Sequence, residues 1–381
     1  MGIRRWLSGT LRPDRLETEE VDAGSVKTGA LNGDYSQLIR YRDVDGWHTV
    51  DPDDYPTGGE ALREVLRRTQ YQQPDTIVSI KLPYRDLEVS STLDLRFNDY
   101  DVFELEQSGM TEGDVVARFQ STITDGSPVI TSEANSATKL DGLHIFGNGS
   151  EGNGMEFKVD DISLPKKLTV KTVGGDGIRC NFSECQTGSM FTDNTGGKGA
   201  SLEARYSQVG KIEAERAGGD GIHFRKLAHS VVYHPNVNRA GRDALRISDA
   251  QGGLIFGGKS DDQSGDSTGS GANIFNANRV RLYNYKTKGY TSGITFDSGA
   301  TDCLAINCDA DTTRGPNYEI LSGTERCGFV GCDYDGSGTV FNISQDAVDV
   351  FVDDPSVNGE LQATPSSSSY TANFSSAFSH W

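Results

Sequence analysis

The sequence repeats itself at an almost constant interval. Nearly the same seven residues occur three times, starting at Gly174, Gly218 and Gly241. The apolar residues that follow these turns and the turn-like segment between them lie 22 or 23 residues apart: Met155, Ile178, Ala200, Ile222 and Leu245. A period of this length is typical of a solenoid, in which each repeat forms one coil that lies on the previous coil.

The residues within each repeat indicate which kind of solenoid forms. Apolar and polar residues alternate, as in Ile222-His223-Phe224, which predicts short strands with one buried face. The Leu-x-x-Leu-x-Leu frame of leucine-rich repeats is absent. The sequence therefore predicts an all-β chain folded as a right-handed parallel β-helix. In such a single-stranded solenoid, equivalent residues of neighbouring coils stack about 4.8 Å apart.

One interval departs from the period. The distance along the chain from Leu245 to Ile294 is slightly more than twice the usual interval, which corresponds either to two coils or to one coil with an insertion. Residues 257–273 are rich in Gly, Ser and Asp, so we expect a surface loop there. Because loops on a rigid scaffold commonly carry recognition, this segment is a candidate for ligand binding, and a disordered surface loop is the alternative.

The period divides the chain into four parts. A helix predicted from Glu60 to Arg68 places its apolar residues on one face and can cover the open end of the solenoid. The predicted parts are a small N-terminal module with a linker (1–56), a capping helix (57–74), the parallel β-helix (75–353) and a Ser-rich C-terminal tail (354–381).

The composition limits the partners. The 55 acidic residues outnumber the 36 basic ones, which gives a formal net charge of −19 and predicts no nucleic-acid partner. Asp is more frequent than Glu and Lys is less frequent than Arg, which favours a halophilic source, because concentrated salt screens such a surface. An ordinary acidic surface is the alternative. No secretory signal follows Arg4 and Arg5 and no stretch approaches 18 apolar residues, so we expect no membrane insertion.

The cysteines and the acidic loops give little sign of a metal. The six cysteines form three C-x4-C pairs, a spacing that is a weak zinc signal, and two of the pairs repeat at the coil period. We therefore expect thiols stacked in the core, with disulfides between stacked positions left open. The segment 333–338 resembles a calcium loop only slightly, since it lacks the downstream Glu. We predict no metal site and no cofactor, and leave open a structural divalent cation.

Three motifs carry a resemblance to a known family. They are Leu82-Pro83, Ser90-Ser91-Thr92-Leu93 and the segment DGLHIFGNG from Asp141 to Gly149. With the helix before them and the repeats after them, they resemble the pectate-lyase-like superfamily and within it are most similar to the tailspike proteins of tailed viruses. The resemblance covers about residues 57–345. It departs after Pro83, where the family usually has Gly and a Tyr and this chain has Tyr84-Arg85-Asp86.

The resemblance, with the composition, implies a virion spike of a halophilic tailed virus, one that infects haloarchaea, which attaches to a host surface glycan or glycoprotein. It implies a homotrimer on the virion surface, with residues 1–56 bound to other virion proteins. One alternative is a polysaccharide-degrading enzyme, a lyase or glycosidase, on the same scaffold; we favour attachment without catalysis. The other alternative is a non-viral cell-surface β-helix protein.

Three carboxylates are the catalytic candidates for the enzyme alternative: Asp176, Asp220 and Asp243. Hydrolysis of a glycosidic bond needs an acid and a base or nucleophile about 5 to 9.5 Å apart. Equivalent positions one or two coils apart supply such separations. The alternative is a turn role, because Asp in a Gly-Asp-Gly turn bonds to the nearby backbone.

A second set of candidates would bind ligand. The residue between the two inward positions of each strand faces outward, which places Arg179, His223 and Arg246 on one face. These side chains could hold an acidic sugar, because the Arg guanidinium binds carboxylates with two parallel hydrogen bonds. A solvated polar face is the alternative.

Overall fold

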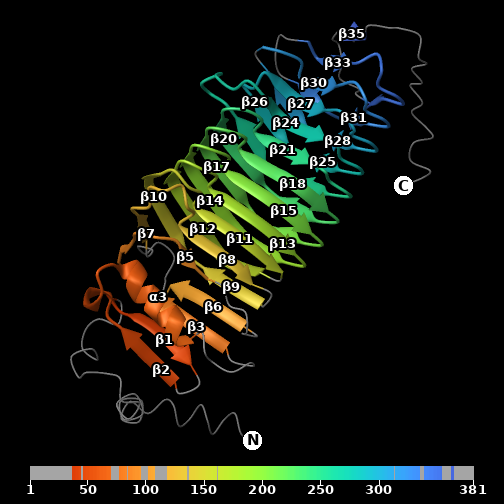
Figure 1. Ribbon diagram of the computed structural model, residues 1–381. Coiled ribbons are helices and arrows are strands. Elements are labelled where there is room, and N and C mark those ends of the chain that lie inside the picture. Colours follow the sequence, from red (N-terminus) through yellow and green to blue (C-terminus); the bar gives the residue numbers. More distant parts are fainter. Residues whose placement is uncertain are drawn as a thin grey trace, which may run out of the picture.

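A computed structural model describes most of the chain (Figure 1). The described residues are 37–43, 46–69, 77–83, 85–95, 102–107, 118–134, 137–160, 162–312, 314–334, 339–353 and 362–363. Most of the predicted N-terminal module, most of the Ser-rich tail and the segment 335–338 lie outside these residues.

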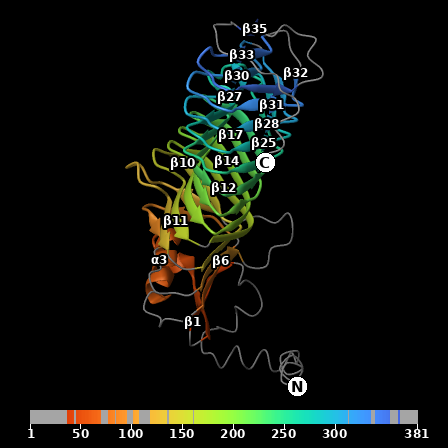
Figure 2. The same ribbon diagram turned by 90° about the vertical axis from the view of Figure 1, so that its right-hand side faces the viewer.

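The described chain is an all-β, right-handed parallel β-helix, as the repeat predicted (Figures 1 and 2). Its strands form a 12-stranded sheet and a 23-stranded sheet. The strands of the 12-stranded sheet are β5 (Leu93–Asp94), β8 (Ile130–Ala134), β11 (Met155–Asp160), β13 (Ile178–Ser183), β15 (Ala200–Arg205), β18 (Ile222–Ala228), β21 (Leu245–Ser248), β24 (Ser270–Phe275), β27 (Ser292–Phe296), β30 (Tyr318–Ile320), β33 (Phe341–Ile343) and β35 (Gln362–Ala363).

The 23-stranded sheet bends around the other sides of the coils, so we divide it into two legs. The first leg follows the 12-stranded sheet along the chain and contains β3 (Ile77–Leu82), β6 (Val102–Gln107), β9 (Ala137–Asp141), β16 (Gln208–Val209), β19 (Val231–Tyr233), β22 (Leu254–Phe256), β25 (Arg281–Tyr283), β28 (Leu304–Ile306), β31 (Gly328–Val330) and β34 (Phe351–Asp353). The second leg comes next and contains β4 (Leu87–Val89), β7 (Arg118–Ser121), β10 (His144–Ser150), β17 (Ile212–Ala217), β20 (Pro235–Ala240), β23 (Lys259–Asp261), β26 (Lys286–Lys288), β29 (Asp309–Asp311) and β32 (Asp333–Tyr334). Two long strands, β12 (Ile162–Val173) and β14 (Gln186–Thr195), belong to both legs.

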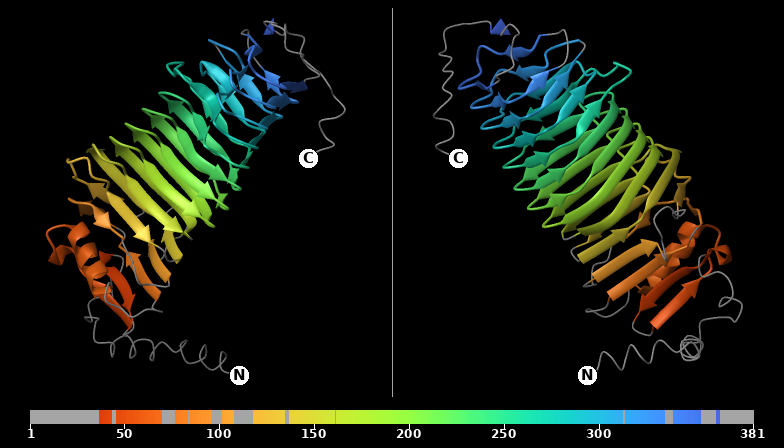
Figure 3. Two further views of the ribbon diagram at one scale, coloured as in Figure 1. Left: turned by 45° about the vertical axis from the view of Figure 1, so that its right-hand side comes forward. Right: turned by 180° about the vertical axis from the view of Figure 1, so that it is seen from behind.

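The N-terminal end of the stack carries the one helix of more than a single turn among the described residues, α3 (Gly58–Thr69) (Figure 3). Its buried side chains include Leu62 and Val65, and its first residues pack against β4, where Gly58 lies beside Leu87. A short 3-10 turn, η2 (Pro52–Asp54), precedes it. Before that turn, β1 (Ile39–Asp43) pairs antiparallel with both β2 (Gly46–Val50) and β3, so this hairpin extends the first leg.

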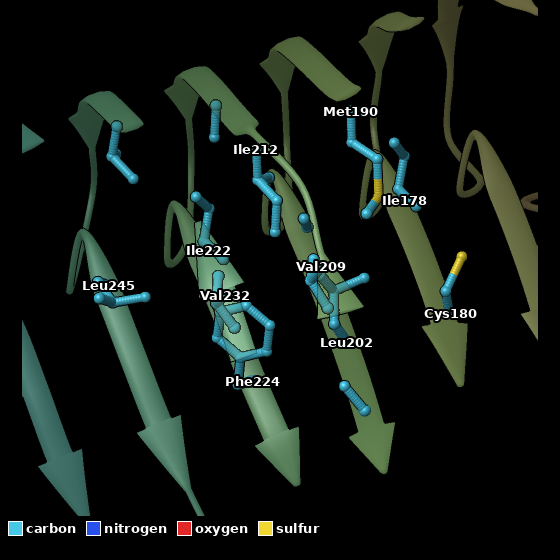
Figure 4. Packing of buried hydrophobic residues seen from close by; sticks show 14 of the residues in the cluster. Ile178, Cys180, Met190, Leu202, Val209, Ile212, Ile222, Phe224, Val232 and Leu245 are labelled. Atoms are coloured by element: carbon cyan, nitrogen blue, oxygen red, sulfur yellow. The ribbon is translucent and has the colours of Figure 1, made fainter. Parts of the chain in front are cut away.

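Stacked apolar residues fill the interior. Ile222 lies directly between Ala200 and Leu245 in the parallel register, so the periodic column of the sequence is a physical column (Figure 4). Phe224 and Val232 of the same coil point into the space between the sheets, and both are fully buried. Burying one such side chain stabilises a fold by about 1.5–3 kcal/mol, which each coil gains from several positions.

The last glycine of the Gly-Gly-Asp-Gly motif is needed for steric reasons. A Cβ atom at Gly221 would lie 2.4 Å from Cγ1 of Val237 on the second leg. The last glycine of the motif therefore lets the 12-stranded sheet begin in close contact with the second leg, where a side chain would collide.

The long interval between Leu245 and Ile294 proves to be two coils, because Leu245 pairs with Ala272 and Ala272 with Ile294. The loop predicted at 257–273 is wrong in part, because β23 and the first four residues of β24 lie within it. The inward residue of β23 is Ser260, a small polar side chain where the coil below has Val237, so the sequence of this strand lacks the expected apolar residue. The extra residues form a turn that Asp262 closes by accepting the backbone N–H groups of Ser264 and Ser267.

The cysteines occupy the predicted inward positions. All six are buried thiols, and Cys303 and Cys308 lie one coil from Cys327 and Cys332, respectively. Burial raises the pKa of the Cys180 thiol, so this side chain is a neutral core residue.

Candidate functional site

The outward row predicted on the 12-stranded sheet exists. Strand pairing places Arg179, Ser201, His223 and Arg246 on four successive coils, at the same position of each strand. Below Arg179 the row continues to Glu156, and above Arg246 it continues through Asn273, Thr295 and Glu319. We call this set the polar row.

Two of the three candidate carboxylates support the coil above them. Asp176 Oδ1 accepts the backbone N–H of Lys198 at 2.8 Å, and one coil below, Asn153 Oδ1 accepts the backbone N–H of Asp176 at 2.6 Å. Asp243 Oδ1 accepts the backbone N–H of Ser270 at 2.8 Å. These side chains hold successive coils together, which is a turn-type role, although the bond runs to the next coil rather than to a residue nearby in sequence.

Asp220 differs from the other two. The residue is 2% exposed, and its Oδ1 has no hydrogen-bond partner among the described residues. Its Oδ2 lies 3.6 Å from Nδ1 of His223, beyond hydrogen-bond length. This buried carboxylate oxygen therefore keeps its capacity to accept a hydrogen bond, unlike the oxygens of Asp176 and Asp243 that bond to the next coil.

His223 and Asp243 are electrostatically perturbed. Burial, followed by the positive charges of Lys198, Arg246 and Arg225, holds the pKa of His223 well below its usual value. The imidazole is therefore neutral at neutral pH, and its Nε2 lies 2.9 Å from Oγ of Ser248. Burial, and to a lesser extent the nearby Asp220, raises the pKa of the Asp243 carboxyl.

Arg246 stands between an acid and an aromatic ring. Its guanidinium lies 3.7 Å from Asp243 Oδ2 and 5.9 Å from the centre of the Phe275 ring on the next coil. Asn273 Nδ2 donates to the same Oδ2 at 3.2 Å. The Arg246 side chain thus has a fixed position while about a quarter of it remains exposed.

A β-bulge brings in a further arginine. Leu202 pairs with Phe224 but Glu203 pairs with Lys226, so Arg225 is an extra residue in β18. Its Nη1 lies 3.2 Å from Oε1 of Glu203, and its Nη2 donates to Asn181 Oδ1 at 2.9 Å. Bulges often occur beside functional sites, where they redirect a side chain.

The structure therefore brings together Asp220, His223, Asp243 and Arg246, on two adjacent coils. We call these residues, with Arg225, the polar cluster. Asp176 and Arg179 lie on the coil two below His223, where Arg179 faces Glu156 at 3.8 Å. They share the row with the cluster but do not belong to it.

Sequence reasoning missed Arg225 and Asn273. The signal for Arg225 is a change in period, because the interval between equivalent positions of neighbouring coils lengthens at the point where β18 gains its extra residue. Asn273 was missed because its coil was interpreted as a loop.

The cluster offers two kinds of chemistry. Forked guanidinium donors, a neutral imidazole and amide groups can bind hydroxyl and carboxylate groups. A carboxyl with a raised pKa next to an unpaired carboxylate can also serve as an acid and a base. Equivalent atoms of adjacent coils lie about 4.8 Å apart, close to the roughly 5 Å separation of the carboxyl groups in retaining glycosidases.

The described residues hold no group of three or more His, Cys, Asp or Glu side chains arranged to bind a metal ion. Within the described part of the chain, no helix is long and apolar enough to span a membrane.

No protein-family model matches this sequence, and no curated protein matches it. Among solved structures, it is similar to ORF18 of Geobacillus virus E2 (11% identity, TM-score 0.45, 82% of this chain and 66% of that one). It is also similar to the Dettilon tailspike protein (9%, 0.43, 76% and 66%) and to the catalytic domain of Agl-KA (11%, 0.49, 78% and 67%). The chain thus spans about two thirds of the length of each of these proteins. At TM-scores below 0.5 these similarities carry no functional argument, and the fold assignment rests on the strand pairing.

Proposed function

We propose that this chain is a virion tailspike that binds a surface polysaccharide or glycoprotein of its host along the 12-stranded sheet. The observation that carries the proposal is the polar cluster, where half-buried Arg246, neutral His223 and the bulged Arg225 converge on one outward face. The three sequence motifs that resemble tailspike proteins support the biological assignment.

A carbohydrate suits this face for physical reasons. The polar row repeats once per coil on a rigid sheet. Ser201 is buried, but Arg179 and Arg246 keep exposed guanidinium groups three coils apart that an extended ligand could reach. Arginine binds carboxylates in a bidentate manner, so an acidic sugar fits best beside Arg246 and Arg179. The neutral imidazole of His223 can accept or donate a hydrogen bond to a hydroxyl group without adding charge.

The remaining parts of the assignment are proposals from the family resemblance and the composition. The proposed spike is a homotrimer attached to other virion proteins through residues 1–56. Its proposed host is a halophile of the haloarchaeal kind, because the Asp-rich, Lys-poor surface suits concentrated salt. We expect the melting temperature to fall as NaCl is lowered from molar to millimolar concentration; an unchanged melting temperature would contradict the halophilic origin.

The binding test uses the purified chain in molar salt with surface glycans isolated from candidate hosts. Arg246→Ala should weaken binding at least tenfold, because a charge-assisted hydrogen bond contributes about 1.5–3 kcal/mol. Asn238→Ala, an exposed change on the second leg, is the matched control and should bind like the wild type. Equal affinity for all three proteins would refute binding at the polar cluster.

A polysaccharide-degrading activity is the second candidate. Two observations favour it: the unpaired Oδ1 of Asp220 and the raised pKa of Asp243. Following released oligosaccharides in the same incubations tests it. Fragments made by the wild type and absent with Asp220→Asn would establish the enzyme, whereas retention of the glycan without release would leave attachment alone.

A further inference from the structure

The first leg carries an apolar outer surface over six coils. In each three-residue strand from β19 to β31 the middle residue points inward and is fully buried, so the residues on either side of it point outward. One outward column is Tyr233, Phe256, Tyr283, Ile306 and Val330, and the other contains Val231, Leu254, Leu304 and Phe351. We call these nine residues the apolar ladder.

The aromatic rings of the ladder stack on one another. The Tyr233 and Phe256 rings lie 6.0 Å apart at 20°, and the Phe256 and Tyr283 rings lie 4.9 Å apart at 10°. Each ring face is therefore turned toward the next coil and only the ring edges face outward. A sugar packs on the face of an aromatic ring, so this arrangement suits apolar packing against a protein surface better than carbohydrate binding.

The other two sides of the solenoid differ in character. From β17 to β29 the outward positions of the second leg hold charged or amide side chains, including Glu213, Lys286 and Asp309, and the 12-stranded sheet carries the polar row. The large apolar residues that are strongly exposed also lie on or beside the first leg: Tyr206 (64%), Tyr233 (40%) and Val348 (52%). Among the ladder residues only Tyr233 is strongly exposed and the others are partly buried, but a contiguous apolar strip on the outside of the solenoid still marks an interaction surface.

We propose that the apolar ladder is the surface through which copies of this chain pack against one another. The net charge favours a second copy of this chain as the partner at the ladder. Two chains that each carry a formal charge of −19 repel each other where their charged faces meet, so they can approach most closely at the uncharged ladder. A basic partner would instead prefer the acidic faces. The two outward columns contain two charged residues. Asp353 ends the first column, and Arg281 in the second directs its guanidinium to the backbone carbonyls of Val280 and Asp302. This inference takes only the expected number of chains, three, from the proposed function.

The test measures oligomeric state by light scattering after size exclusion, in molar salt and at tens of micromolar protein. Tyr233→Glu with Ile306→Glu places charges in the ladder and should convert the oligomer to a monomer. Asn238→Glu with Asn236→Glu adds the same charge to the second leg and should leave the oligomer intact. Tyr233→Glu alone, at a residue already 40% exposed, is the variant least able to disturb folding and should raise the dissociation constant at least tenfold.

Three results would overturn the inference. The first is a wild-type chain that is monomeric at these concentrations, and the second is an oligomer that withstands the ladder variants. The third is a monomer that associates only after residues 364–381 are deleted, since the chain's own C-terminal residues would then cover the ladder. Glycan binding is measured on the same samples, so that the two proposals are tested separately. A chain that forms the oligomer but does not bind glycan would refute only the proposed function of the polar cluster.

Discussion

Asp176 and Asp220 occupy equivalent turns, but the structure predicts opposite responses to substitution. Asp176→Ala removes the acceptor of the Lys198 backbone N–H, which leaves a half-buried donor without its charged partner. Hydrogen bonds to charged groups contribute about 1.5–3 kcal/mol to the free energy of unfolding. Asp220→Asn removes no hydrogen bond, because Asp220 Oδ1 has no partner among the described residues and Oδ2 is 3.6 Å from His223 Nδ1.

The chain supplies a matched control for this prediction. One coil below Asp176, the amide oxygen of Asn153 accepts a backbone N–H of the next coil in the same way. Asp176→Asn therefore keeps the acceptor, and its free energy of unfolding should stay within about 0.5 kcal/mol of the wild type. In Asp220→Asn, the new amide can donate to His223 Nδ1, which also has no hydrogen-bond partner in the described part of the chain. This variant should therefore be as stable as the wild type, or more stable, since a buried charge is lost.

The assay is thermal unfolding followed by circular dichroism in molar salt. For a β-helix of about 280 residues, an unfolding entropy of about 2.1 cal/mol/K per residue makes 1 kcal/mol worth roughly 1.7 °C, so Asp176→Ala should melt about 2.5–5 °C below the other variants. The reasoning is refuted if Asp176→Ala melts with the wild type, or if Asp220→Asn loses as much stability as Asp176→Ala.

The other predictions concern the core and the pH dependence. Phe224→Ala empties a fully buried site and should cost about 3–5 kcal/mol in denaturant unfolding, whereas a loss below about 1 kcal/mol would contradict the packing in Figure 4. The fold raises the pKa of the Asp243 carboxyl, so the stability from its protonated form is fully present below the unfolded pKa and is lost as pH rises through the folded pKa. Asp243→Asn should remove this pH-dependent loss of stability. Parallel pH profiles for the variant and the wild type would refute the prediction. Arg326 pairs with Asp302 at 2.6 Å and lowers the pKa of the Asp302 carboxyl, so the stability from this pair is present at neutral pH and lost as pH falls through the folded pKa. Arg326→Ala should reduce the loss of unfolding free energy at acid pH by less than about 1 kcal/mol, because Arg326 is half exposed. An unchanged loss at acid pH would argue against the pair.

The sequence was sufficient for the fold because the interior is periodic. Each column residue, such as Ile222, contacts its equivalents one coil away, so the period of the chain and the spacing of the core are the same quantity. The register also placed His223 beside Arg246 correctly. Prediction was wrong where the interior residue was polar, as at Ser260, because a strand with a small polar inward residue has no hydrophobic alternation.

Two features of the surface could not be predicted for physical reasons. The Arg225 bulge changes the pairing partner of Glu203 by one residue, and only the three-dimensional register shows on which strand the extra residue lies. The apolar ladder was missed because strands such as Val231–Tyr233 are apolar on both faces, so their sequence does not distinguish the inward side from the outward side. The assignment of residues 1–56 to a separate module and of the tail to 354–381 stays a prediction.

The polar cluster and the start of the apolar ladder share the same coils. His223 lies on β18, and the next strand of that coil is β19, which carries Tyr233. Chains packed in register along their ladders would therefore present their clusters at one height along the spike axis. Several individually weak contacts could then engage a single repetitive surface at once, and the resulting avidity would exceed the affinity of any one contact by orders of magnitude.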